Sequence, residues 1–281
     1  MGDGNGGGIL YVVATPIGNL ADLSGRAREV LATVDRIAAE DTRQTAVLLR
    51  HYGLSTPLVA YHEHNEEAMA RRLVEALAGG ERIALVTDAG TPLVSDPGYR
   101  LVRAARAGGL RVEPVPGPSA CITALSAAGL PSDRFLFLGF PPRAHARRRA
   151  EFAAVRGEPG TLVWYESGRR IVATLSDLIQ VLGGDREGVL ARELTKLHET
   201  FLYGTLASLH GRLERDPEQC LGEMVLLVAG ARAEAADEAE ARRVLGLLLP
   251  ELPLKKAVSL TAEITAARRN RIYELALEMR R

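Results

Sequence analysis

Short apolar segments alternate with amphipathic ones along the first half of the chain, and this alternation constrains the fold more than any other feature of the sequence. The apolar segments are ILYVVA (9–14), RIAA (36–39), PLVA (57–60), RIALV (82–86) and RVEPV (111–115). Between them lie stretches in which apolar residues recur at helical spacing, such as 42–51 and 66–78. Strands that alternate with helices predict a largely parallel sheet with helices on both faces.

The second half of the chain follows a different pattern. From Phe135 onward, segments of strand character are separated unevenly by two helical stretches, near 143–155 and 169–182. The strand segments are FLFLG (135–139), TLVWYE (161–166), GVLAREL (188–194) and EMVLLVA (223–229). We expect a second α/β domain with a mixed sheet, divided from the first near PVPGPS (114–119), where proline and glycine interrupt regular structure.

The C-terminal segment has a helical pattern. Residues 231–245 are rich in alanine and glutamate and predict a helical linker, and residues 252–281 predict two short helices broken near 268–270, which is the outline of a helix-turn-helix. The sequence therefore predicts an α/β protein with four parts. These are a disordered tail (1–8), an N-terminal α/β domain (9–117), a C-terminal α/β domain (118–230) and a helical segment (231–281).

Composition excludes several classes of protein. The 35 basic and 35 acidic residues balance, which argues against a strongly cationic nucleic-acid coat but leaves room for local basic patches. The two cysteines, Cys121 and Cys220, form no CxxC pair, as expected of a protein in a reducing compartment. The same observation argues against a structural zinc site. No apolar run approaches the ~20 residues of a membrane helix. We expect a cytoplasmic protein that is not bound to a membrane.

Two motifs that suggest ligand binding fail on their context. Gly2, Gly4 and Gly7 satisfy GxGxxG, but they precede the first strand, whereas a dinucleotide-binding loop lies between a strand and a helix. His62 and His64 suggest a metal site, but no third ligand is evident near them in the sequence. We therefore predict no metal.

Three loops at strand ends are the strongest candidates for a ligand site. TPIGN (15–19), TDAGTPLVSDPG (87–98) and PGPSA (116–120) follow the first, fourth and fifth predicted strands. Ligands of open α/β sheets bind past the carboxyl ends of strands, so the three loops are expected to converge. None carries a phosphate-binding lysine of the Walker type, which favours a small zwitterionic ligand. Asp88, Gly90 and Thr91 are expected to contact it, whereas Asp96 fits a helix cap equally well.

Two charged blocks and one basic run allow both a structural and a functional interpretation. In AEDTR (39–43), Asp41 or Thr42 suits a helix N-cap, and a buried ion pair with Arg43 is a further structural possibility, while Arg43 could instead contact a phosphate. ARELTKLHE (191–199) is either a solvated charged edge or part of a site. RAHARRR (143–149) is either a solvated helix face or a rim that faces RNA.

Taken together, these blocks resemble a known enzyme family. AEDTR, TDAGTPLVSDPGY (87–99), VPGPSA (115–120), LGFPP (138–142) and ARELTKLHE look like the signature blocks of the ribosomal small-subunit RNA 2′-O-methyltransferases of the RsmI type, in the tetrapyrrole-methylase-like superfamily. The resemblance runs from about Ile9 to Gly230 and more weakly beyond it. It implies the two-domain class III methyltransferase fold, with S-adenosylmethionine bound between the domains, and a homodimer that methylates a cytidine ribose in the decoding centre of 16S rRNA, within the small ribosomal subunit.

The resemblance also implies site residues. The cofactor shell would consist of Pro16, Asp88, Ala89, Gly90, Thr91, Ser119, Ala120 and Tyr165. The segment YESGRR (165–170) departs from the family pattern, in which a proline or alanine and a histidine are expected before the arginine.

Methyl transfer from a sulfonium is an in-line displacement, so a group that orients or deprotonates the ribose hydroxyl is needed near the methyl donor. Candidates for that group are Glu40, Asp41, Glu193 and Lys196, and the sequence does not choose among them. Basic side chains would hold RNA phosphates. The candidates are Arg43, Arg192, Lys255, Lys256, Arg268 and Arg269.

Two other functions remain open at this point. A tetrapyrrole (cobalamin-precursor) methyltransferase would share the cofactor loops, although the basic C-terminal segment has no evident use in it. A non-enzymatic RNA-binding protein on the same fold is the second, and cofactor-dependent methyl transfer would exclude it.

Overall fold

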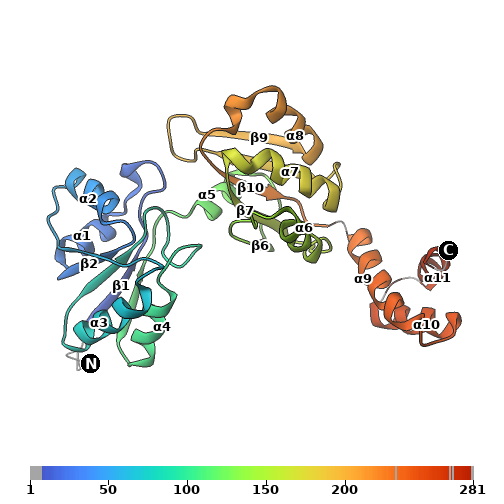
Figure 1. Cartoon of the computed structure of the whole chain (residues 1–281), viewed down its shortest axis with the longest axis horizontal. Helices are drawn as coiled ribbons and strands as arrows, with labels where there is room; N and C mark the ends of the chain where they lie inside the picture. The colour runs from blue at the N-terminus through green and yellow to red at the C-terminus, as the bar shows by residue number, and fades with distance from the viewer. Residues whose placement is uncertain (1–7, 232, 266, 268, 280–281) are drawn as a thin grey trace. The chain divides into compact units, whose positions relative to one another are not determined.

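The computed structural model describes residues 8–231, 233–265, 267 and 269–279. The chain divides into two compact units. The first unit comprises Met1–Ala124 and Arg192–Thr200, and the second comprises Leu125–Ala191 and Phe201–Arg281 (Figure 1). The first unit is therefore discontinuous in sequence, because nine residues from the second half of the chain belong to it.

The first unit is built on a parallel sheet. Its strands are β1 (Ile9–Val13), β2 (Arg36–Ala39), β3 (Leu58–Ala60), β4 (Ile83–Val86) and β5 (Arg111–Val115). They lie in the order β3-β2-β4-β1-β5, and each neighbouring pair is parallel. β1 and β4 are neighbours although the chain passes through β2 and β3 between them, so the loops that follow β1 and β4 start side by side at one edge of the sheet.

Helices cover both faces of this sheet, as the alternating pattern predicts (Figure 1). The helices are α1 (Gly25–Thr33), α2 (Thr42–His51), α3 (Glu66–Ala78) and α4 (Tyr99–Ala107), with a short 3-10 helix at Leu20–Asp22. The next helix, α5 (Ala120–Ala127), spans the division between the two units. One core joins α1 and α2 to Val13, Ile37 and Val86 of the strands. The opposite core joins α3 and α4 to the alternate strand residues Leu10 and Leu85. Side chains of successive strand residues point to opposite faces, which explains this division.

The second unit contains the mixed sheet. Its strands are β6 (Phe135–Phe137), β7 (Thr161–Ser167), β8 (Glu187–Arg192), β9 (Thr200–Thr205) and β10 (Glu223–Val228), in the order β6-β7-β10-β8-β9. β6 and β7 are parallel, whereas β7 and β10 are antiparallel. The helices α6 (His145–Ala154), α7 (Gly168–Leu182) and α8 (Leu206–Arg215) cover it, and a 3-10 helix spans Pro217–Cys220. Phe152 of α6 and Trp164 of β7 pack edge to face at the centre of the core, both fully buried.

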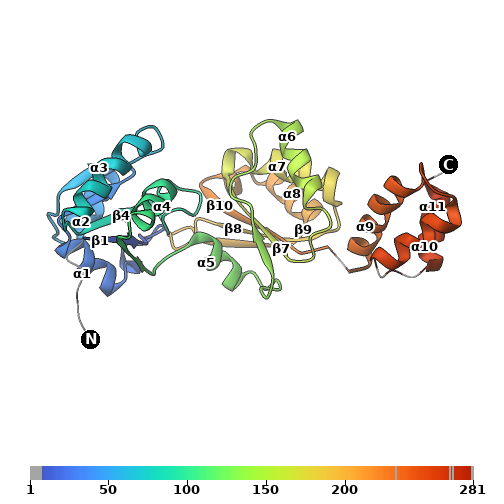
Figure 2. The same ribbon diagram turned by 90° about the horizontal axis from the view of Figure 1, so that it is seen from below.

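The C-terminal segment folds into three helices with a small core of their own (Figure 2). They are α9 (Ala233–Leu248), α10 (Leu254–Thr265) and α11 (Arg269–Glu278). Ala241 and Leu245 of α9 pack against Val258 of α10 and Leu275 of α11. The predicted helical character of this segment is confirmed. Across the part of the chain that the structure describes, no helix is both long enough and apolar enough to cross a membrane.

Candidate functional site

The loops that follow β1, β4 and β5 meet at the carboxyl edge of the first sheet, as expected. Thr15 and Gly90 exchange two backbone hydrogen bonds, of 2.8 and 3.0 Å between nitrogen and oxygen. The Thr15 hydroxyl donates to the carbonyl of Thr87 at 3.1 Å, and the Thr91 hydroxyl donates to the carbonyl of Pro118 at 3.0 Å. These bonds tie residues 15–19, 87–98 and 116–120 into one structure, which we call the three-loop cradle.

Glycine allows the backbones of the cradle to approach one another. Gly90 has a φ of +89°, a conformation that side-chain-bearing residues rarely adopt. A Cβ at Gly90 would lie 3.5 Å from Cγ2 of Ile17 and 3.9 Å from the carbonyl oxygen of Pro118, so it would occupy the space between the first and third loops. A Cβ at Gly117 would lie 3.0 Å from Cβ of Ala14. Glycine at these two positions thus lets the three loops pack closely together.

Four of the other cofactor residues inferred from the resemblance belong to the cradle loops. Pro16 is buried, Ala89 is exposed, and Ser119 and Ala120 lie partly exposed at the start of α5. Tyr165 belongs to the second unit, where it is partly exposed at the end of β7. Its ring makes edge contacts with Phe137 and Phe140, at centroid distances of 4.8 and 5.5 Å.

Carboxylates gather beside the cradle, where β2 and β4 end. The oxygens of Asp88 accept hydrogen bonds from the backbone N–H of Asp41 at 2.9 Å and from the side chain of Gln44 at 3.1 Å. The Glu40 carboxylate accepts a long bond, 3.4 Å, from the backbone N–H of Asp88. The Asp88 side chain therefore links the ends of two strands, which the sequence did not reveal, while each of its oxygens keeps a lone pair for a further donor.

Burial and mutual repulsion change the proton affinities of these carboxylates. Burial is the largest cause of a raised pKa at Glu40, to which the charges of Asp88 and Asp41 also contribute. Burial likewise raises the pKa of Asp88. The pKa of Asp96 rises to about 7, mainly by burial and then by repulsion from Glu40, against a hydrogen bond from Thr87 that lowers it. Because these carboxylates are partly buried and repel one another, a cationic ligand beside them would stabilise their ionised forms.

Asp41 serves a different purpose from its neighbours. It is the N-cap of α2, and its Oδ1 accepts from the backbone N–H of Arg43 at 2.8 Å. The Arg43 guanidinium pairs with Oδ2 at 2.6 Å, and this hydrogen bonding lowers the pKa of Asp41 to about 2. The capping interpretation of AEDTR is confirmed, whereas the ion pair with Arg43 forms at the surface and is not buried. The side chain of Arg43 is nevertheless 89% exposed and free to meet a second anion.

The loop Arg192–Thr200, which joins β8 to β9, packs on the first unit against Gly18. A Cβ on Gly18 would fall 2.5 Å from Cγ of Lys196 and 2.9 Å from the carbonyl oxygen of Leu194, so only glycine permits this contact. Glu193 and Thr195 have φ values of 50° and 65°, in the left-handed region. Backbone strain at ordinary residues is retained where the surroundings impose it, frequently at functional sites.

Within this loop the charged side chains are held in place. Nζ of Lys196 lies 3.0 Å from Oε1 of Glu193, and both side chains are partly buried. The Glu199 carboxylate accepts a 2.6 Å bond from the backbone N–H of Thr195. Nε of Arg192 and the hydroxyl of Thr195 are buried without a hydrogen-bond partner. The loop is therefore an organised element that brings Glu193 and Lys196 beside the first loop of the cradle, rather than a solvated edge.

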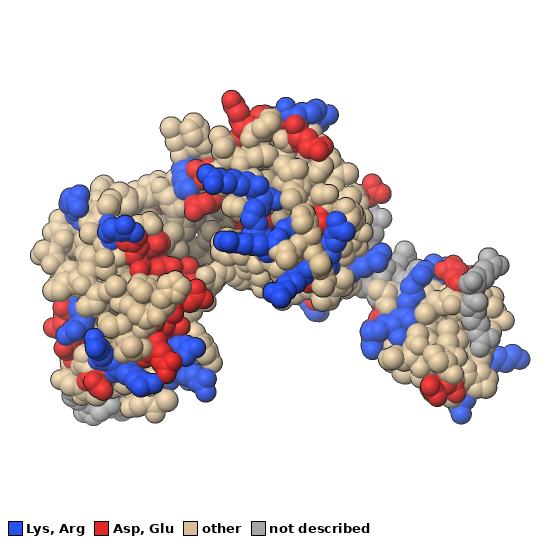
Figure 3. Space-filling view, viewed as in Figure 1, with Lys and Arg blue, Asp and Glu red and all other residues tan. Residues whose placement is uncertain are grey.

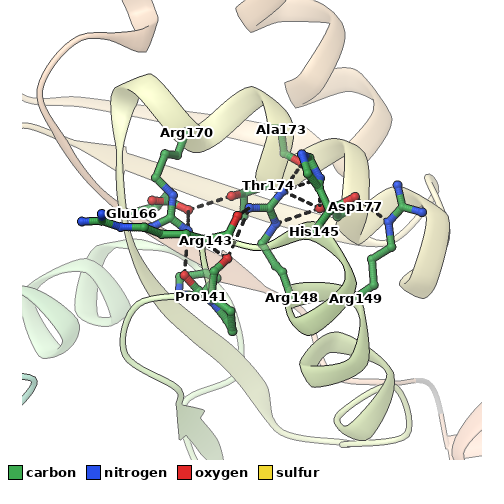
Figure 4. A network of polar contacts seen from close by, with 11 residues as sticks. Pro141, Arg143, His145, Arg148, Arg149, Glu166, Arg170, Ala173, Thr174 and Asp177 are labelled. Carbon is green, nitrogen blue, oxygen red and sulfur yellow. Dashed lines mark hydrogen bonds and ion pairs between the residues drawn. The ribbon is translucent and has the colours of Figure 1, made fainter.

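A second polar network lies at the start of α6 and along α7 (Figure 4). The Asp177 carboxylate, 1% exposed, pairs with Arg148 at 2.5 Å and Arg149 at 2.6 Å, and lies 3.0 Å from Nδ1 of His145. Burial would raise the pKa of Asp177, but the hydrogen bonds from Arg149, Arg148 and His145 outweigh it and lower the pKa. RAHARRR thus divides into three residues that pair with Asp177, of which Arg148 is buried while His145 and Arg149 are exposed, and two exposed arginines outside this network, Arg143 and Arg147.

The remaining sequence candidates lie in the helical C-terminal segment or concern metal. Lys255, Lys256 and Arg269 are exposed on α10 and α11, and Arg268 lies outside the described residues. The rings of His62 and His64 are 6.0 Å apart between centroids. Among the residues with described positions, no group of three or more His, Cys, Asp or Glu side chains is arranged to hold a metal ion.

Comparison with known proteins agrees with the fold. The family model "Tetrapyrrole (Corrin/Porphyrin) Methylases" matches residues 9–210, and the model "RsmI C-terminal HTH domain" matches residues 235–280. A solved structure of diphthine synthase superposes with a TM-score of 0.60 at 16% identity, covering 82% of this chain and 93% of that one. The methyltransferase CobJ superposes with a TM-score of 0.59 at 21% identity, covering 80% and 95%. At these identities the likeness shows the shared fold alone.

Curated relatives are much closer in sequence. The protein named ribosomal RNA small subunit methyltransferase I from Pseudomonas aeruginosa is 55% identical over 274 residues, covering 96% of this chain and 97% of that protein. Its namesake from Escherichia coli O157:H7 is 53% identical over 275 residues, covering 98% and 96%. Because the matches extend across both units and the helical segment, the chain is a methyltransferase that belongs to the ribosomal RNA small subunit methyltransferase I family, within the tetrapyrrole methylases.

Proposed function

We propose that the chain transfers a methyl group from S-adenosylmethionine to the 2′-hydroxyl of a cytidine ribose in 16S rRNA, acting on the small ribosomal subunit in the cytoplasm as a homodimer. The observation that carries the proposal is the packing of the Glu193–Lys196 loop against the cradle at Gly18. It puts a carboxylate and an ammonium group beside a cradle suited to a small ligand, within a chain whose relatives at 53–55% identity carry the name of rRNA methyltransferases.

The cradle fits S-adenosylmethionine on two structural grounds. The lack of a side chain at Gly90 leaves the space between Ile17 and Pro118 unfilled, so the three loops can approach one another around a small ligand. The carboxylates of Glu40, Asp88 and Asp96 supply negative charge for a ligand with a sulfonium and an ammonium group. Bound there, the cofactor would supply an electrophilic methyl group. Its proposed contacts are Pro16, Asp88, Ala89, Gly90, Thr91, Ser119 and Ala120, with Tyr165 from the second unit.

The environments of the four acceptor candidates separate their roles. A base needs a pKa near the working pH, and Asp41, whose pKa falls to about 2, is the poorest of the set. Glu40, whose pKa is raised, is better suited to accept the proton that the ribose hydroxyl loses as its oxygen attacks the methyl carbon. Glu193 and Lys196 form a pair that can hold the hydroxyl between an acceptor and a donor. We propose that this pair orients the nucleophile.

RNA phosphates are proposed to bind the exposed guanidinium of Arg43, together with Arg192 near the strained loop and the basic residues of the helical segment. The latter are Lys255, Lys256, Arg268 and Arg269. Contacts of this kind position a protein on RNA without reading its sequence. We also propose that the two α/β parts act as functional domains, 9–117 and 118–230, and that the tail 1–8 has no part in the site.

Methyl transfer to small subunits lacking the modification tests the proposal. We expect label from methyl-labelled S-adenosylmethionine to appear in 16S rRNA, and mass spectrometry of nuclease digests to identify 2′-O-methylcytidine. Glu193→Gln and Lys196→Ala are expected to lower kcat on small subunits by about 10- to 100-fold while cofactor affinity changes by less than about twofold, because the pair acts on the hydroxyl. RNA binding with no methyl transfer under saturating cofactor would contradict the proposal and favour a non-enzymatic RNA-binding protein.

A truncation after Gly230 tests the role of the helical segment. We expect cofactor binding to survive and methylation of small subunits to fall, with a flatter dependence of RNA binding on salt because phosphate contacts are lost. Equal activity of the truncated and full-length chains at matched salt would leave RNA contact to Arg43 and Arg192.

A further inference from the structure

The turn between β6 and α6 is held from both sides by arginines of the second unit (Figure 4). Nη2 of Arg170 donates to the carbonyl oxygens of Pro141, at 2.6 Å, and Pro142, at 3.2 Å. Nη1 of Arg148 donates to the carbonyl oxygens of Pro142 and Arg143, each at 3.3 Å. Three consecutive carbonyl groups, which no helix or sheet would otherwise satisfy, thus receive charged donors.

Each of these arginines is itself fixed by a buried carboxylate. Arg170 pairs at 3.4 Å with Glu166, whose side chain is fully buried and also accepts from the Thr174 hydroxyl at 2.7 Å. Arg148 is 3% exposed and pairs with Asp177. Ion pairs at this depth require good geometry to offset the loss of hydration, so the turn is strongly determined in position. The sequence offers no evident reason for holding a surface turn so firmly.

Two kinds of side chain project from this fixed turn. Phe140 is 57% exposed, although its ring is apolar, and it is supported from one side by the edge contact with Tyr165. Arg143 and Arg147 follow within seven residues and are exposed. Of the residues that the structure describes, none forms an ion pair with either guanidinium. Figure 3 shows Lys and Arg side chains gathered on the face of the second unit that carries α6 and the start of α7.

From this arrangement we propose that the Phe140–Arg147 surface binds a single-stranded segment of the RNA substrate, with an unstacked base on the Phe140 ring and neighbouring phosphates on Arg143 and Arg147. The inference rests on the proposed function and adds to it an RNA contact apart from the cradle. An exposed aromatic ring beside unpaired cations is the combination that single-stranded RNA recognises, because every base has a face that stacks and every phosphate carries a charge. An apolar protein partner would have no use for two unpaired guanidinium groups.

Substitutions of Phe140 test the stacking contact. Phe140→Leu keeps an apolar side chain of similar reach but removes the aromatic face, and Phe140→Trp keeps a larger one. With a single-stranded oligocytidylate RNA as the probe, and with undermethylated small subunits, we expect Phe140→Leu to weaken binding by on the order of tenfold and Phe140→Trp to retain wild-type affinity. The only native tryptophan, Trp164, is fully buried, so quenching by RNA of the indole fluorescence that Phe140→Trp introduces would report stacking directly.

The cations are tested by charge with a matched control. Arg143→Gln combined with Arg147→Gln is expected to reduce the slope of log affinity against log salt by about 1.4, since each phosphate contact on a single strand contributes about 0.7. Arg212→Gln combined with Arg215→Gln on α8 removes the same charge from exposed positions of the same unit and is expected to leave the slope unchanged.

The outcomes separate this inference from the proposed function. If the wild-type chain methylates small subunits but Phe140→Leu leaves the RNA affinity unchanged, the inference alone is overturned. If the wild-type chain transfers no methyl group, the proposed function is overturned. Cofactor affinity is measured in parallel, because Phe140 touches Tyr165, and an equal loss of cofactor and RNA affinity would assign Phe140 to cofactor support and overturn the inference. A change in oligomeric state on sizing of Phe140→Leu would assign the surface to a contact between copies and overturn it likewise.

Discussion

Replacing Asp96 with Asn tests the electrostatic account of the cradle through stability rather than activity. In the folded chain the pKa of Asp96 is about 7, against an ordinary value of 3.8. The folded state therefore holds a proton that the unfolded state releases between these two values, and stability falls as the pH rises from about 4 to 7. The Asn side chain keeps an oxygen that can accept from Thr87 but never ionises. Asp96→Asn should therefore remove the loss of stability with rising pH.

The size of this stability change follows from the pKa shift of Asp96. Each pKa unit corresponds to about 1.4 kcal/mol, so a shift of about 3 units sets an upper limit of about 4 kcal/mol, and because Asp96 is partly exposed we expect solvent screening to reduce it to about 2 kcal/mol. Urea unfolding of the cofactor-free chain at pH 5 and pH 8 measures the free energy of unfolding of the wild type and the variant. The unfolded carboxyl is already ionised at pH 5, so about two thirds of the effect falls between these pH values. We therefore expect Asp96→Asn to stabilise the first unit by about 1 kcal/mol more at pH 8 than at pH 5. A variant whose gain is equal at both pH values would refute the raised pKa and its assigned cause.

Three further substitutions probe other elements. Gly90→Val places a β-branched residue at a φ of +89° and should weaken binding of S-adenosylmethionine by at least about tenfold in calorimetry. A variant that binds the cofactor as tightly as the wild type would remove Gly90 from the proposed cofactor site. Gly18→Ala brings a Cβ to 2.5 Å from Cγ of Lys196, so kcat should fall about tenfold with cofactor affinity retained, and unchanged kcat would mean that the loop can shift without consequence. Asp177→Ala leaves the buried Arg148 without its ion-pair partner and should cost about 3–5 kcal/mol in urea unfolding. Arg148→Met in the same chain should restore only part of this loss, because it also removes the hydrogen bonds to Pro142 and Arg143, and a loss below about 1 kcal/mol would show that water replaces the carboxylate.

The fold was predictable because its signals are local. The five strands of the first sheet and their helices follow directly from the periodicity of apolar residues, and the three loops converge because parallel strands end at one edge. What the sequence could not supply were contacts between distant residues. Gly18 looked like one glycine of a short loop, and its importance depends on Lys196, which is 178 positions away in the chain.

The charged positions were the hardest to assign from sequence. AEDTR and RAHARRR each allowed a structural and a functional interpretation, and in each block the structure gives some residues a structural role and leaves others exposed. Asp41 caps α2 while Arg43 stays exposed, and Arg148 is buried on Asp177 while Arg143 and Arg147 stay exposed. Asp177 itself appeared as an ordinary polar residue of a helix, because burial of a charge depends on which helix packs against it.

The discontinuity of the first unit has a consequence for synthesis of the chain. The N-terminal part of the first unit ends at Ala124, whereas its second part, Arg192–Thr200, is completed only 76 residues later. At ordinary translation rates of about 5–20 residues per second, this delay is about 4–15 s. During that time the loop after β1 lacks the segment that covers Gly18. Glu193 and Lys196, the residues proposed to orient the acceptor, therefore join the first unit only after β8 has been made.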